Sequence, residues 1–216
     1  MTVLIPFILY LLYERKFYGI GFLLIGSIFL SFYKQQFELR QTIPTPFKRI
    51  PFEFIVGFRR TFILLIAMYL LLWQAIQVDN FNLALFCLGF TFLIFCSYYF
   101  ESEKIYFVWI FSKDPNQFLL HKLSLGLLSA LILSMPLCLI LLVCYPSNWF
   151  LIIGVEMIGF IILVAIILAK YSAFPHQMNL PQVILFTLSL VFPFLLFFTI
   201  PIFYIQAKRR LKPILR

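Results

Sequence analysis

Long apolar runs separated by short polar segments constrain this chain more than any other feature. Such runs occupy residues 61–77, 83–100, 119–144, 150–169 and 183–206. About 20 apolar residues in a helix cross the hydrocarbon core of a bilayer, and these runs approach or exceed that length. Only 12% of the residues are charged, whereas a soluble domain carries about a quarter, so much of the surface must face lipid. We therefore predict an all-α fold: a polytopic integral membrane helical bundle of about six or seven membrane segments with amphipathic interfacial helices.

Polar boundaries divide the chain into four predicted parts. These are an N-terminal membrane hairpin over 1–33, a basic cytoplasmic loop with an interfacial elbow helix over 34–60, a membrane helical bundle over 61–206 and a basic cytoplasmic tail over 207–216. The segment Lys34–Arg60 carries six basic residues against two acidic ones, and short loops rich in Lys and Arg stay in the cytoplasm. The first apolar piece, Thr2–Tyr13, is short for a span, so it either pairs with the next run as a tight hairpin, which we favour, or lies at the interface.

The end of the basic loop has the pattern of a helix lying on the cytoplasmic leaflet. In the segment Pro51–Arg60, apolar side chains fall on one side of a helix and charged ones on the other, as in helices that bury one face at the acyl boundary. The cations expected among the headgroups are Lys48, Arg49, Arg59 and Arg60. Two interpretations remain open: an ordinary juxtamembrane anchor, or an elbow helix that positions the bundle and meets a partner.

The C-terminal third sets a conflict between two topology rules. The segments 78–82 and 145–149 contain no Lys or Arg and are expected outside, so simple alternation of spans puts the tail outside as well. The tail, Ala207–Arg216, carries five basic residues and should stay inside. Either Val183–Gln206 is a re-entrant hairpin that turns near Pro193, or one of the earlier spans is misassigned.

Glu156 is the one acidic residue inside a predicted span. A charge at the centre of a bilayer costs roughly 3 kcal/mol on insertion scales, so this side chain should face a cavity or a partner, or carry a proton. It could line a path for substrate or protons. It could equally form a hydrogen bond within the bundle near Gly154 and Gly159, where helices approach closely.

The sequence lacks the usual signatures of catalysis or cofactor binding. The two histidines, His121 and His176, are far apart and have no metal-ligand spacing, and the four cysteines form no CxxC pair. There is no Walker A or other phosphate-binding loop. We therefore predict no catalytic residues, no metal and no cofactor. The net charge of +9 lies at the ends of apolar runs, where it suits lipid headgroups rather than nucleic acid.

The segment Glu101–Lys122 resembles the cytoplasmic loop that follows the second core span in permease subunits of ABC-2-type exporters. In order it has an acidic start, an apolar stretch, a turn with proline and a lysine where the next span begins. The residues expected to couple to a partner are Glu101, Glu103, Lys104, Lys113, Asp114 and Lys122. The resemblance covers roughly Pro46–Lys170, and it implies a homo- or hetero-oligomer with a separate ATP-binding subunit docked on this loop.

The expected function is therefore the membrane-spanning permease subunit of an ATP-driven, ABC-type exporter in a bacterial inner membrane. The chain itself is expected not to be an enzyme, because any ATP hydrolysis would reside in the partner subunit. The alternative is a non-catalytic subunit that anchors or assembles a larger cell-envelope complex. A membrane-embedded lipid enzyme is disfavoured, because the loops carry no acidic pair with histidine or other metal-ligand cluster.

Overall fold

The computed structural model describes residues 52–100, 103, 105–109, 114–176 and 179–215. Every regular element within these ranges is a helix, which confirms the all-α prediction for this part of the chain. The predicted hairpin at 1–33 and most of the basic loop lie outside the described residues. The predicted site residues that also lie outside them are Lys48, Arg49, Glu101, Lys104 and Lys113.

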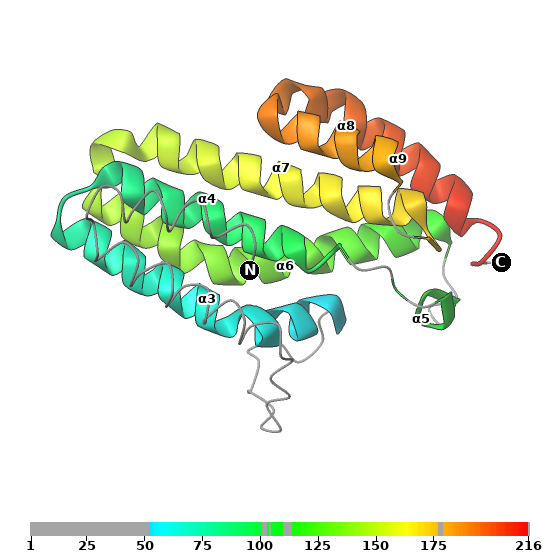
Figure 1. Ribbon diagram of the computed structural model, residues 1–216, viewed down its shortest axis with the longest axis horizontal. Helices are drawn as coiled ribbons and strands as arrows, with labels where there is room; N and C mark the ends of the chain where they lie inside the picture. The colour runs from blue at the N-terminus through cyan, green and yellow to red at the C-terminus, as the bar shows by residue number, and fades with distance from the viewer. Residues whose placement is uncertain (1–51, 101–102, 104, 110–113, 177–178, 216) are drawn as a thin grey trace, which may run out of the picture. The chain divides into compact units, whose positions relative to one another are not determined.

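Four long helices form the bundle in the described part (Figure 1). They are α3 (Phe52–Gln77), α4 (Phe81–Ser97), α6 (Pro115–Cys144) and α7 (Trp149–Ala173). The helices α3 and α6 and the segment Pro146–Ala173 are each long and apolar enough to cross a membrane. The fourth helix, α4, is apolar but only 17 residues long. Length and composition therefore indicate an integral membrane helical bundle, as the apolar runs predict.

The first described helix joins two segments that the sequence pattern predicts as separate helices. Residues 52–60 do not form a separate interfacial helix, because α3 runs from Phe52 to Gln77 without a break. Phe54 and Phe58 are buried, and the same face continues through Leu65, which is the spacing of one amphipathic helix. Tyr98, just after α4, packs its ring against Gly57, where a Cβ atom would overlap it. The predicted elbow is thus the first part of a bundle helix.

The C-terminal region is a helical hairpin packed on α7. Helix α8 (Leu180–Val191) is followed by the 3₁₀ turn η2 (Pro193–Leu195) and by α9 (Leu196–Leu211). The twelve residues of α8 are about 18 Å long, too short to cross a bilayer. The structure therefore agrees with the first of the two predicted topologies, a hairpin that turns at Pro193. A proline at this place fits, because it lacks the N–H group that would continue α8.

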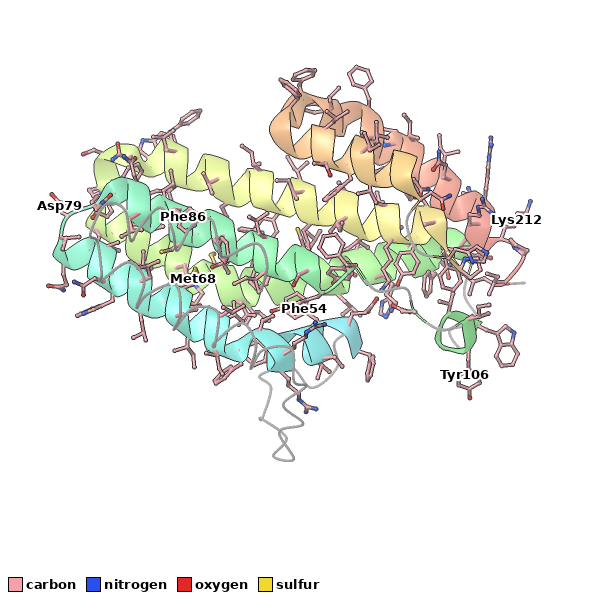
Figure 2. The ribbon with its side chains drawn as sticks, in the orientation of Figure 1. Phe54, Met68, Asp79, Phe86, Tyr106 and Lys212 are labelled. Carbon is pink, nitrogen blue, oxygen red and sulfur yellow. The ribbon has the colours of Figure 1, made fainter. Side chains whose placement is uncertain are left out.

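Both ends of this hairpin return to the end of the bundle where α7 finishes. Gln182 Nε2 near the start of α8 donates to Ser172 Oγ of α7 at 3.1 Å. Tyr204 Oη of α9 donates to Asn116 Oδ1 at the start of α6, at 3.3 Å. Lys212 therefore lies at the same end as the first turn of α6, while Asp79 lies at the opposite end (Figure 2). The basic tail therefore lies at the end of the bundle where α6 begins (Figure 2).

Close contacts bring α7 into the centre of the bundle. It packs against α4, α6 and α9, and its second half, from Ala165 to Ala173, is buried without interruption. Gly159 lies directly against the ring of Phe92 on α4, and a Cβ atom there would overlap that ring. Small residues at such crossings let membrane helices approach closely. The end of α7 is consequently shielded from both lipid and water.

The segment between α4 and α6 contains one short helix, α5 (Ile105–Trp109). Val108 is fully buried, whereas Ile105, Tyr106 and Trp109 are 51%, 61% and 57% exposed. Figure 1 shows α5 beside the end of the bundle where α6 begins. The sequence predicts that this apolar segment is buried against the membrane or in a groove. Of these four side chains, only that of Val108 is buried within the protein.

Candidate functional site

Four charged residues from distant parts of the chain meet at the end of the bundle where α3 begins and α7 finishes. Glu53 is the second residue of α3, Glu103 precedes α5, Lys122 belongs to α6 and Lys170 to α7. Their side chains are between 2% and 10% exposed. We refer to these four residues, together with Tyr171, as the charge cluster.

Each lysine of the charge cluster binds both carboxylates. Lys122 Nζ donates to Glu103 Oε1 at 2.7 Å and to Glu53 Oε2 at 3.2 Å. Lys170 Nζ donates to Glu53 Oε1 at 2.7 Å and to Glu103 Oε1 at 3.5 Å. The hydroxyl of Tyr171 adds a donor to Glu103 Oε1 at 2.9 Å. Two positive and two negative charges therefore balance, which a buried ionic group requires to offset the loss of its hydration.

Aromatic rings surround the two ammonium groups. Lys170 Nζ lies 5.7 Å from the ring centroids of Tyr99 and Tyr171. Lys122 Nζ lies 5.8 Å from the centroid of Phe118. These distances allow cation–π attraction, which is strongest where water is excluded. The rings thus stabilise the lysines and separate the cluster from solvent.

Glu103 is the member of the charge cluster that lies outside the long helices. Burial, together with the neighbouring Glu53 carboxyl, raises the pKa of Glu103 above its ordinary value, although Lys122 and Lys170 act in the opposite direction. Of the two carboxyls that share these lysines, the loop residue is therefore the one that gains a proton more readily. Proton uptake there would leave the two lysines facing a single carboxylate.

The cluster has the chemistry of a structural tie rather than of a reaction centre. Both lysines are hydrogen-bonded as donors, and both carboxylates are engaged as acceptors. Among the described residues, no group of three His, Cys, Asp or Glu side chains could hold a metal ion. What the arrangement does is join α3, α6, α7 and the segment before α5 through one set of buried ion pairs.

The predicted coupling residues do not behave as one surface. Glu103 and Lys122 turn inward and are occupied by the charge cluster, so they are not available to a partner in this conformation. Asp114 is exposed at the N-cap of α6. Arg59 and Arg60, predicted as interfacial anchors, are exposed on the third turn of α3. The predicted group therefore separates into a buried part and an exposed part.

Sequence reasoning missed Glu53, Lys170 and Tyr171 as site residues. Glu53 and Lys170 are 117 positions apart, and a single sequence gives no indication that they pair. One signal was present: Glu53 is an acid within a strongly basic segment, at the start of an apolar run. A balancing role for it could have been suspected on that ground.

Glu156 lies apart from the charge cluster. It is buried on α7, and its Oε1 accepts a hydrogen bond from Ser134 Oγ of α6 at 2.6 Å. Glu156 therefore lies within a long apolar helix and faces the interior of the bundle, with Ser134 as its hydrogen-bond partner.

Comparisons with protein-family models, with curated proteins and with solved structures find no match to this chain.

Proposed function

We propose that this chain is the membrane-spanning permease subunit of an ATP-driven, ABC-type exporter and works with a separate ATPase subunit. The observation that supports the proposal is the pair of contacts by which Glu103, next to the exposed helix α5, joins Lys122 of α6 and Lys170 of α7. An exporter of this kind needs such a connection, because the energy of ATP hydrolysis has to reach the membrane helices from outside them.

The exposed surface of α5 is aromatic. Tyr106 and Trp109 are more than half exposed, while Val108 holds the helix against the protein. Aromatic side chains are enriched at the centres of protein–protein interfaces, because they bury a large area with few rotatable bonds. A short helix that is held on one side and aromatic on the other suits a docking contact.

Glu103 provides a mechanical link between α5 and the membrane helices. Glu103 lies two residues before the start of α5 and contacts both Lys122 and Lys170. Separating a buried ion pair by removing one partner costs about 3–5 kcal/mol, so the cluster resists being pulled apart. A displacement of α5 is therefore passed to α6 and α7 rather than absorbed in the loop.

We assign the orientation of the bundle in the membrane from the distribution of charge. The exposed cations Lys208, Arg209, Arg210 and Lys212 lie in the last turn of α9 and directly after it, at the end of the bundle that carries α5 (Figure 2). The opposite end has Asp79 and, among the described residues, neither Lys nor Arg between 77 and 82 or between 144 and 149. The positive-inside rule then assigns the α5 end to the cytoplasm, where ATP is available. We extend the proposal to a bacterial inner membrane and to six or seven membrane segments, counting the hairpin at 1–33.

One observation favours the rival function, an anchor or assembly subunit of a cell-envelope complex. The α8–α9 hairpin returns to the end from which it starts. The region after α7 therefore supplies no further crossing, whereas the permeases that the sequence resembles have six spans. A static contact surface on α5 would serve such a subunit equally well.

The test is co-purification of the native protein in mild detergent, with its companions identified by mass spectrometry. The double variant Tyr106→Ala, Trp109→Ala should lose a companion that contains a Walker A loop, and with it the ATP hydrolysis of the complex. Trp149→Ala is the matched control, because Trp149 is 56% exposed at the opposite end of the bundle. Envelope proteins without any ATPase would support the rival function, and retention of the ATPase by the double variant would exclude α5 as its docking site.

A further inference from the structure

A third buried carboxyl, that of Glu156, lies within a long apolar helix of the bundle, away from the charge cluster. Glu156 is seven residues after Trp149, the first residue of α7, which is about 10 Å along the helix. The residue is 8% exposed. Its Oε1 accepts from Ser134 Oγ, while its Oε2 is buried and has no hydrogen-bond partner among the described residues.

Apolar side chains enclose this pair on both sides. On α6, Ala130 lies one turn before Ser134 and belongs to the larger hydrophobic cluster, and Cys138 lies one turn after it and belongs to the smaller one. On α7, Ile152 lies one turn before Glu156 and belongs to the smaller cluster, and Leu163 lies two turns after it and belongs to the larger one. The carboxyl therefore sits where the two hydrophobic clusters meet.

No described cation balances a charge on Glu156. The titratable side chains in and around the smaller cluster are Tyr69 of α3, Cys87 of α4, Cys138 of α6 and Tyr145. All of these are neutral at neutral pH. Helix α8 has no charged residue, and the charges of α9 begin at Lys208. On α7 itself Lys170 is 14 residues further on, or about 21 Å along the helix.

An ionised carboxylate in such surroundings, with one hydrogen bond and no counter-charge, is strongly disfavoured relative to the neutral acid. A proton is also the one ligand that needs no cavity, and the carboxyl is closely enclosed. We propose that Glu156 is a proton-binding site within the membrane, loaded while α6 and α7 are packed together. Because Ser134 donates to Oε1, the proton is carried by Oε2.

The release step follows from the same geometry. When α6 and α7 separate at this level, water reaches Oε2, takes the proton and hydrates the carboxylate that remains. The reverse step, proton uptake by the carboxylate, allows the two helices to close again. This inference does not rest on the protein being an exporter, because it depends only on the enclosure of Glu156.

The test is infrared spectroscopy of the full-length protein in lipid membranes, which distinguishes a neutral carboxylic acid from a carboxylate. The wild-type spectrum minus that of Glu156→Gln should contain the carbonyl band of a neutral acid at neutral pH. Carboxylate bands in its place would overturn the proposal.

A pair of serine variants gives a second readout that does not need Glu156 to be replaced. Ser134→Ala removes the hydrogen bond to Oε1, so the neutral-acid band should shift to higher frequency. Ser129→Ala is the matched control, because Ser129 Oγ donates to the Leu125 carbonyl oxygen of its own helix at 2.7 Å. An unshifted band in Ser134→Ala, or an equal shift in both variants, contradicts the assignment.

Discussion

The charge cluster and the Glu156–Ser134 pair both bury carboxyl groups, yet they treat them in opposite ways. In the cluster, Glu53 and Glu103 each accept hydrogen bonds from both lysines. Glu156 has a single serine hydroxyl. The comparison teaches that burial alone does not define the role of an acid. A buried carboxylate that is surrounded by cations joins helices through ion pairs. A buried carboxyl without nearby cations can instead bind and release a proton.

The largest change in stability is expected when one cation is removed from the charge cluster. Lys170→Met keeps most of the side-chain volume but leaves two buried carboxylates with one lysine. We expect a loss of about 3–5 kcal/mol of stability, because uncompensated buried charge is costly. Thermal unfolding of the purified protein in detergent should show a marked fall in Tm, whereas Lys208→Met, at an exposed position of α9, should change it little. An unchanged Tm for Lys170→Met would mean that the cluster does not hold the bundle together.

A smaller change in stability is expected when Glu103 is replaced, and this change depends on pH. The folded protein raises the pKa of Glu103 above its ordinary value of 4.5, so the folded state binds this proton more tightly than the unfolded state. The resulting contribution to stability is present below pH 4.5 and is lost as the pH rises through the folded pKa. Glu103→Gln lacks this titration.

The measurement is Tm as a function of pH for the wild type and for Glu103→Gln. The Tm of the wild type relative to that of the variant should decline as the pH rises from 4.5. Parallel curves would show that Glu103 does not titrate within this range, and a relative rise would mean that the lysines lower its pKa instead.

The smallest change in stability is expected when Glu156 is replaced. If the group is a neutral acid, Glu156→Gln replaces it by a neutral side chain of nearly the same shape that still accepts from Ser134. We expect a change in stability within about 1 kcal/mol, measured by thermal unfolding next to Lys170→Met. A large gain in stability would contradict the neutral-acid assignment, because it would show that the native carboxyl is ionised and has no counter-charge.

Much of the fold follows from the apolar runs. The predicted segments 83–100 and 119–144 correspond to α4 and α6, which end within a few residues of the expected places. The hairpin at Pro193 was one of two predictions that reconciled the basic tail with the number of spans. Helix α3 begins at Phe52, next to the predicted start of the elbow helix at Pro51, but it continues to Gln77 without the predicted division before Thr61. The pattern of 52–60 is amphipathic, and amphipathicity alone does not tell an interfacial helix from a helix packed in a bundle.

The candidate site could be predicted only in part. Glu103 and Lys122 were singled out by their order along the loop, but they were predicted to contact a partner rather than the interior of the bundle. Their inward orientation depends on Glu53 and Lys170, which reach the same place only after the helices have packed. Glu156 was identifiable because a carboxyl in an apolar span is rare, whereas Ser134 was not, since a serine in a span carries no comparable signal.

The separation of 117 residues between Glu53 and Lys170 has a consequence for how the protein is made. Ribosomes add about 5–20 residues per second, so roughly 6–23 s pass between the synthesis of Glu53 and that of Lys170. During that interval the set of counter-charges around Glu53 is incomplete. The cluster can close only after α7 has been synthesised.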